Sequence, residues 1–428
     1  MIMNKEEITL LKYKDVLEKL KDQECHLLLG NGFNLSLGVN TSYESIFKKM
    51  IENDHGIYKE AENIFVESNY DLEQFIGKLE NSINDENKFL KKYVKNKVKF
   101  DFMKAAHEIV KSGIKNVYAE KNEGIFMLLK NFTNYFTLNY DSFLYLLLLN
   151  FKSEPNKETT IAFSSTPKLI EDDMNTKQNY IYSEIKMARK NGTLSINTGD
   201  KSTTISEPLS EVTKNFLMNA LYEYSKSMKK GWTKKNIDKA LNLILEEEKK
   251  NNILEKVDDG SRQQNLFDDT TDFVFDTKNE TQNLFFLHGA FHIYRAGKEE
   301  KKITQETDKA LYDRLEEILN NEKQDIICVF ASEDKIDEIN KSQYLTKCYN
   351  KLQKLSGVMV IIGCSLSDND DHIFKQIHES EINTLYISTT NKNKEKNYTV
   401  ANNKFNNKKI FLFEAESITY ELPDKEKG

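Results

Sequence analysis

The chain has 428 residues, of which 39% are hydrophobic and 30% charged, with only 4 prolines. This composition is typical of packed, largely helical protein and excludes a disordered chain. The 61 basic and 68 acidic side chains give a net charge of −7, which disfavours general nucleic-acid binding because phosphate polyanions are repelled.

The four cysteines are too widely spaced for a paired zinc knuckle, and most lie in or beside apolar runs. We therefore expect buried, reduced thiols and no zinc ribbon. The first fifteen residues are interrupted by charges, and the longest apolar run, 143–149, is too short to cross a bilayer,. We expect a cytoplasmic protein without a targeting or membrane segment.

The first strand is predicted at 25–29, an apolar run that leads directly into the turn Gly30-Asn31-Gly32,. Between Ser42 and Tyr118, apolar residues recur every three or four positions, which predicts helices against one side of a sheet. A second buried strand is predicted at 135–138, and an apolar helix at 143–149 follows it.

After Asn150 the sequence becomes richer in Lys, Asn, Ser, Thr and Asp, and long apolar stretches are fewer. We interpret 151–282 as an insertion that is mainly helical and polar. Within it, helical spacing occurs at 211–228 and 235–248, whereas 257–280 is acidic and polar and is expected to be a poorly ordered loop.

The sheet is predicted to resume after the insertion, because short apolar runs again alternate with helical spacing. This alternation predicts an α/β fold, with a Rossmann-like, mostly parallel sheet and helices on both faces. Residues 1–150 and 283–428 would form this discontinuous domain. The strands are expected at 284–287, 326–330, 358–362, 384–387 and 409–413, and the helices at 336–355 and 372–378.

Polar residues follow four of these strands, at the edge where ligands bind in parallel sheets. They are Gly30 to Asn34, Asn139 to Asp141, His288-Gly289 and Gly363 to Asp368. We expect the four strand ends to converge on one crevice.

Each strand end has a chemical interpretation and a purely structural one. Gly30 and Gly32 can bring backbone amides close to phosphate oxygens, or can simply form a tight turn. Asn139 and Asp141 can hold a polar ligand together, or Asp141 can cap the following helix. Both roles of Asp141 can coexist.

His288 lies at the rim of an apolar strand and is a candidate general base, with His292 and His372 as competitors,. A core histidine bonded to a carbonyl is the structural alternative. The carboxylates of Asp368, Asp370 and Asp371 suit ribose hydroxyls. They lack the calcium-loop pattern, so we expect no metal.

The order GNGFN, TLNYD, LHG and GCSL resembles the sirtuin series of a GAG-type loop, an NxD element, an HG pair and a GTSL-type turn. The longer phrases GNGFNLSLGVNTSYESIF, FTLNYDSFLY, FFLHGAFHIY and VMVIIGCSLSDNDDHIF are similar to the sirtuin-like, NAD-cleaving effector domain of bacterial antiphage defence proteins. The resemblance covers these four blocks and leaves out the insertion.

The resemblance implies that NAD is bound as a substrate and that the strand-end residues contact it. Asn139, Asp141 and His288 would be catalytic, with Asn139 and Asp141 at the nicotinamide ribose and His288 as the base. Contacts to the pyrophosphate, ribose and adenosine would come from Gly30, Asn31, Gly32, Phe33, Asn34, Tyr43, Gly363, Ser365, Leu366 and Asp368.

Two departures argue against protein deacylation: the zinc-binding cysteine pairs of deacetylating sirtuins are missing, and Asn40-Thr41-Ser42-Tyr43 stands where those enzymes have an acidic-arginine element. The resemblance instead implies an NAD glycohydrolase that depletes NAD in abortive antiphage defence. Its expected partners are further copies of the chain and a HerA-type hexameric ATPase. The alternatives are a non-catalytic NAD or ADP-ribose sensor, or a subunit that docks a partner through the insertion, including the basic cluster 229–235.

Overall fold

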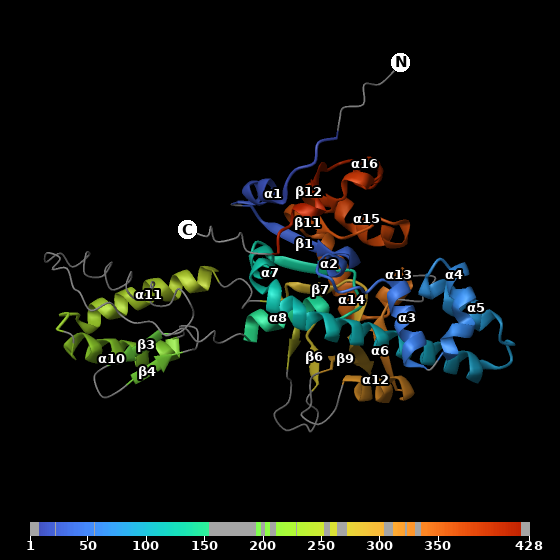
Figure 1. Cartoon of the computed structure of the whole chain (residues 1–428), viewed down its shortest axis with the longest axis horizontal. Helices are drawn as coiled ribbons and strands as arrows, with labels where there is room; N and C mark the ends of the chain where they lie inside the picture. Colours follow the sequence, from blue (N-terminus) through green and yellow to red (C-terminus); the bar gives the residue numbers. More distant parts are fainter. Residues whose placement is uncertain are drawn as a thin grey trace, which may run out of the picture. The chain divides into compact units, whose positions relative to one another are not determined.

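The computed structural model describes residues 8–21, 23–54, 56–153, 194–197, 202–205, 211–227, 229–251, 257–262, 272–303, 311–321, 323–329 and 335–420. The chain divides into two compact units. We call Met1–Leu147 with Val257–Gly428 the sheet unit, and Leu148–Lys256 the insertion unit. Figure 1 shows the elements of each unit.

The sheet unit contains a six-stranded sheet in the order β13-β12-β11-β1-β2-β7, and every neighbouring pair is parallel. The predicted α/β fold with a Rossmann-like sheet is confirmed. The strands are β1 (Cys25–Leu29), β2 (Asn134–Thr137), β7 (Leu284–Phe286), β11 (Ser356–Ile362), β12 (Glu381–Thr389) and β13 (Lys409–Glu414).

The central strands are buried on both faces, which explains why β1 is apolar in the sequence except for the buried His26,. Helices α1 (Tyr13–Leu20) and α16 (Lys394–Lys404) contact β13 at one edge of this sheet. Helix α14 (Gln343–Gln353) contacts β7 at the other edge and also packs on α15 (Asp371–Glu379). Figure 1 shows α15 and α16 beside β11 and β12.

The helical segment predicted from Ser42 to Tyr118 is confirmed, and capping side chains divide it. Ser42, Asp71 and Asn87 each accept a backbone N–H of the following turn, so three helices begin after these residues,. The elements up to β2, with the helix after it, are α2 (Asn31–Ser36), α3 (Tyr43–Asn53), η1 (Ile57–Ala61), α4 (Glu62–Glu67), α5 (Leu72–Asn81), α6 (Lys88–Glu120), α7 (Asn122–Leu129) and α8 (Phe143–Ser153).

A second sheet, which the sequence did not predict, has the antiparallel order β10-β8-β9-β6-β5. The run expected at 326–330 belongs here as β10, not to the parallel sheet; its last residue lies outside the described residues. The strands are β5 (Ser261–Arg262), β6 (Phe273–Phe275), β8 (Gly289–Ala296), β9 (Glu299–Lys302) and β10 (Gln324–Cys328).

Two expectations about the insertion need correction. Strands β5 and β6 lie within 257–280, so this segment contributes two short strands to a sheet and is not wholly a loop, while 263–271 lies outside the described residues. The insertion unit therefore ends at Lys256 and not at Gln282. A buried ion pair between Lys302 of β9 and Asp259 connects this acidic segment to the sheet.

The expected helix at 336–355 is two helices, because Ser342 caps α14 by accepting the N–H of Leu345,. The remaining elements of the sheet unit are α12 (Leu311–Asn320), α13 (Lys335–Asn340), η3 (Asp368–Asp370), η4 (Asn391–Asn393) and η5 (Ala415–Ser417).

The insertion unit contains the two predicted helices, α10 (Glu211–Ser227) and α11 (Lys234–Asn251), and a hairpin of β3 (Leu194–Asn197) and β4 (Ser202–Ile205). Its basic cluster is partly packed: Trp232 is buried against Tyr224, and the Lys230 ammonium lies over both rings,.

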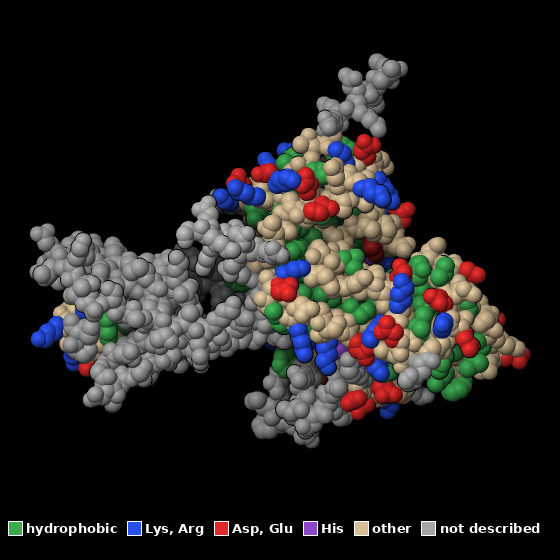
Figure 2. All heavy atoms as spheres, in the orientation of Figure 1, with side chains coloured by type: hydrophobic (Ala, Val, Ile, Leu, Met, Phe, Trp, Pro, Cys, Tyr) green, Lys and Arg blue, Asp and Glu red, His purple; other side chains and the backbone are tan. Residues whose placement is uncertain are grey.

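Among the described helices, none is long and apolar enough to cross a membrane. The four cysteines are free thiols, two of them buried and two half-buried. On the face of the sheet unit seen in Figure 2, basic and acidic side chains are interspersed.

Candidate functional site

A cavity of about 560 Å³ lies at the carboxyl ends of four neighbouring strands, β11, β1, β2 and β7. Each strand end predicted to converge contributes to its wall: Gly30 to Gly32 after β1, Asn139 to Asp141 after β2, His288 after β7, and Gly363 to Ser365 after β11. After β1 the chain forms β2 and β7 on one side of that strand, and it later returns to form β11 on the other side. The cavity therefore lies at a topological switch point of the sheet,.

The glycines hold the turns after β1 and β11 against each other. A Cβ atom on Gly32 would lie 2.6 Å from Cα of Gly363, and one on Gly30 would lie 2.5 Å from the Gly363 oxygen. The N–H of Gly32 donates to that oxygen at 2.9 Å, and Gly363 adopts a φ of +70°,. The N–H of Gly30 likewise donates to the Ile362 oxygen at 2.9 Å. The tight-turn role of Gly30 and Gly32 is therefore present, and both of their amides are already satisfied.

A buried asparagine connects the three loops at the cavity. The Asn34 amide donates to Asp141 Oδ2 at 2.8 Å and to Thr41 Oγ1 at 3.0 Å, and its Oδ1 accepts from Asn139 Nδ2 at 3.1 Å. Thr41 Oγ1 in turn donates to Asn31 Oδ1. This network fixes the orientation of Asn139 and Asp141 at the cavity wall.

Asp141 performs both roles considered from the sequence. Its Oδ1 accepts the Phe143 N–H at 2.8 Å and so caps α8, while the residue also lines the cavity,. Burial raises the pKa of Asp141 to about 6, although hydrogen bonds from Phe143 and Asn34 oppose that rise,.

His288 is buried, and both sides of its ring are engaged. Its Nε2 lies 3.1 Å from Nε2 of His372, and its ring stacks near Tyr140 at 5.9 Å between centroids. A hydrogen bond to the Leu138 backbone raises its pKa, so the carbonyl accepts and His288 donates. Burial, followed by the charge of Lys335, nevertheless lowers the pKa of His288 to about 3, and the ring is neutral at pH 7,.

Three further ionisable residues surround His288. Asp370 Oδ1 lies 3.7 Å from both His288 Nε2 and Lys335 Nζ, and Lys335 and Asp370 line the cavity. Burial raises the pKa of Asp370, and burial and the neighbouring His288 lower the pKa of His372 to about 4. Sequence reasoning missed Lys335, because it reaches the site from α13, far along the chain from every motif.

Not every residue predicted at the site reaches the cavity. Asn31, Tyr43 and Ser365 line it, whereas Asn34 lies behind the wall. Phe33 is a core residue against Phe143 and Tyr420. Leu366 and Asp368 do not line the cavity either. Leu366 is buried, and Asp368 is exposed and forms an ion pair with Lys404 at 2.8 Å.

The competitor His292 also lies away from the cavity wall. It is buried in β8, where it stacks on Tyr145 and meets the edge of Phe286. In the part of the chain that the structure describes, no group of three or more His, Cys, Asp or Glu side chains is arranged to hold a metal ion.

Comparison with protein families finds that residues 210–420 are similar to a family described as a domain of unknown function (DUF4917). The matched region contains α10, α11, His288 and the Gly363 turn, but not β1, β2 or Asn139. A search of curated proteins finds no match.

Proposed function

We propose that this chain is an NAD glycohydrolase, which hydrolyses NAD to nicotinamide and ADP-ribose. The observation that carries the proposal is the cavity at the switch point, where an oriented amide, a buried carboxylate and a neutral imidazole meet: Asn139, Asp141 and His288. Its volume of about 560 Å³ lies in the range of small-molecule sites, roughly 300–1,000 Å³,.

The polar wall suits the two riboses and the pyrophosphate. Asn31 and Ser365 offer side-chain hydrogen bonds, and the Lys335 ammonium, held near Asp370, supplies a positive charge for phosphate oxygens,. Because the N–H groups of Gly30 and Gly32 already bond Ile362 and Gly363, we assign less of the phosphate binding to the glycine turn than its sequence suggested.

The reaction breaks the bond between ribose C1′ and the nicotinamide nitrogen. The bonding electron pair stays with that nitrogen, so nicotinamide leaves as a neutral molecule and positive charge develops on the ribose ring. An ionised Asp141, oriented by Asn34, stabilises that charge, and the Asn139 amide positions the ribose,. No metal is needed, because nicotinamide is already a good leaving group.

Water then attacks C1′ and releases a proton. His288 is neutral at pH 7 and accepts that proton on Nε2 when its contact with His372 opens, and then releases it to the solvent that fills the cavity,. The resemblance to antiphage effector domains further suggests that NAD depletion in infected bacterial cells is the biological role, within a homo-oligomer or with a HerA-type ATPase.

The test is direct: the purified full-length chain is incubated with NAD, and nicotinamide and ADP-ribose are followed by chromatography, with and without candidate partner ATPases. We expect both products in equal amounts, and none from Asn139→Ala, which removes the ribose contact but little core packing,. A folded Asn139→Ala variant with full NAD cleavage would refute the site assignment.

One observation favours a second function, the sensing of NAD or ADP-ribose without cleavage. His288 Nε2 is engaged by His372 and burial lowers the pKa of the ring to about 3, which makes it a weak base in this conformation. NAD binding measured by calorimetry, with no product under any condition, would support the sensor and reject the enzyme.

A further inference from the structure

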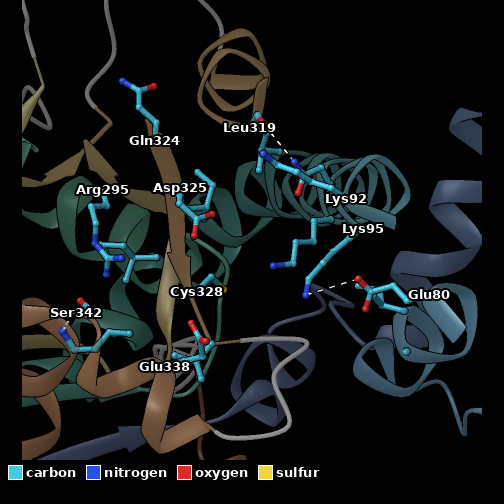
Figure 3. Close-up of a pocket in the computed structure, with 18 of the residues that line it drawn as sticks. Glu80, Lys92, Lys95, Arg295, Leu319, Gln324, Asp325, Cys328, Glu338 and Ser342 are labelled. Atoms are coloured by element: carbon cyan, nitrogen blue, oxygen red, sulfur yellow. Dashed lines mark hydrogen bonds and ion pairs between the residues drawn. The ribbon is translucent and has the colours of Figure 1, made fainter. Parts of the chain in front are cut away.

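A second cavity, of about 1,090 Å³, lies in the sheet unit between α5, α6, β10 and the start of α14. None of its lining residues lines the proposed NAD cavity. Figure 3 shows its two long walls, the strand that carries Gln324 to Cys328 and the helix that carries Lys92 and Lys95. It is therefore a cavity distinct from the proposed NAD site.

The first wall is the edge of the antiparallel sheet. Strand β10 is the last strand of the antiparallel sheet, and in the described residues it pairs with β8 alone. Six consecutive residues, 324–329, line the cavity, so the cavity follows the whole strand. An edge strand offers one row of backbone N–H and C=O groups for another strand to pair with.

The second wall is a row of lysines. Lys92, Lys95 and Lys99 follow one another at spacings of three and four on α6 and so share one helix face,. The whole lining contains five basic and three acidic side chains, in a chain whose net charge is −7. Burial and the neighbouring Lys95 lower the pKa of Lys99, although the carboxylates of Asp325 and Glu338 oppose this shift,.

From these two walls we propose that the cavity binds an extended acidic segment of a partner protein, which adds a strand to the edge of β10. Ile326 and Cys328 pack in the same core cluster as residues of α3, α5 and α6. In a strand added beside β10, every second side chain would face α3, α5 and α6, as Ile326 and Cys328 do. Asp or Glu at those positions would contact the lysines of α6. The strand length accommodates about five residues,.

A compact polyphosphate fits this cavity less well than an acidic strand. Glu80, Asp325 and Glu338 stand among the basic residues, and Glu80 lies 3.9 Å from Lys95. A dense anion would be repelled by these carboxylates while it bound the lysines. A strand instead places one carboxylate on every second residue, with apolar side chains between them.

The test uses a fluorescein-labelled octapeptide of alternating Glu and Val, titrated with the full-length chain while anisotropy is measured. We expect saturable binding that weakens with salt. The double variant Lys92→Gln/Lys95→Gln should weaken binding about tenfold. The matched control, Lys91→Gln/Lys97→Gln, removes the same charge from α6 outside the cavity and should bind as the unchanged chain does.

Two further probes test the strand pairing. In a strand, alternate N–H groups point to opposite edges, so N-methylation of either the Glu or the Val amides should abolish binding and methylation of the other set should not. The proposal would be overturned if the peptide did not bind, or if both double variants weakened binding equally. It would also be overturned if both methylated peptides bound equally, or if an equimolar amount of inorganic tripolyphosphate displaced the peptide fully.

Discussion

At the scale of single residues, His288 distinguishes an enzyme from a sensor. His288→Ala should leave NAD binding measured by calorimetry nearly unchanged, since the loops that hold the ligand remain. Loss of a general base lowers turnover by about a hundred- to ten-thousandfold. Equal nicotinamide release by the variant and the unchanged chain would move the role to His372 or Asp141. Unfolding of the variant would assign His288 to the core.

Asp141 should make folding stability depend on pH in a direction opposite to most carboxylates. Its folded pKa of about 6 lies above the ordinary 3.8, so the protonated form is favoured in the fold. The resulting stabilisation is complete below about pH 4 and is lost as the pH rises through 6, a change of about 3 kcal/mol.

The variant Asp141→Asn has no carboxyl group to titrate at this position. The difference in unfolding free energy between it and the unchanged chain, measured by urea denaturation, should therefore shift in favour of the variant between pH 4 and 7.5. A difference that stays constant with pH would contradict the raised pKa. If ionised Asp141 stabilises the ribose cation, NAD cleavage should in turn increase through about pH 6,.

At the scale of elements, the turns after β1 and β11 should tolerate no added atom. Gly32→Ala places a Cβ atom 2.6 Å from Cα of Gly363, so we expect a loss of about 3 kcal/mol in the free energy of unfolding,. The matched control is Gly77→Ala inside α5, where a Cβ atom meets nothing within 4 Å, and it should stabilise by up to about 1 kcal/mol,. Equal melting temperatures for the two variants would contradict this close packing.

The same turns show how much of the fold the sequence predicts. Buried parallel strands are continuous apolar runs followed by glycine or polar residues, so β1, β2, β7 and β11 and their convergence were predictable. The second sheet was not, because β5 and β6 are short and lie in an acidic segment in which the buried Asp259 is paired with Lys302 of another strand. The sequence shows both charges but not that they meet.

The candidate site also contains residues that the sequence predicts and residues that it does not. Asn139, Asp141 and His288 directly follow strands, so strand prediction alone brings them together. Lys335 and the contact of His372 with His288 depend on how α13 and α15 pack, and no local pattern encodes that packing. Phe33 and Leu366 belong to the right motifs, yet their apolar side chains turn into the core.

At the scale of the whole molecule, acid should destabilise the fold through its buried histidines. In the part of the chain that the structure describes, the pKa values of five histidines are lowered, in each case with burial as the largest cause: His26, His107, His288, His292 and His372. The fold keeps them neutral while the unfolded chain binds protons below about pH 6.5. Stability should therefore fall on acidification, by up to about 1.4 kcal/mol per pH unit for each histidine, and Asp141 offsets part of this loss.

His292 is the best position at which to measure the effect, because in the described residues neither of its ring nitrogens has a hydrogen-bond partner. Its pKa of about 3 implies that it alone removes about 2 kcal/mol of stability between pH 7 and pH 5,. His292→Phe keeps an aromatic ring against Tyr145 and Phe286 and cannot be protonated. In urea denaturation the variant should match the unchanged chain within about 1 kcal/mol at pH 7.5 and lose about 2 kcal/mol less on going to pH 5. The same loss in both proteins would mean that His292 is protonated in the folded state, and that Asp259, rather than burial and Lys302, dominates its surroundings.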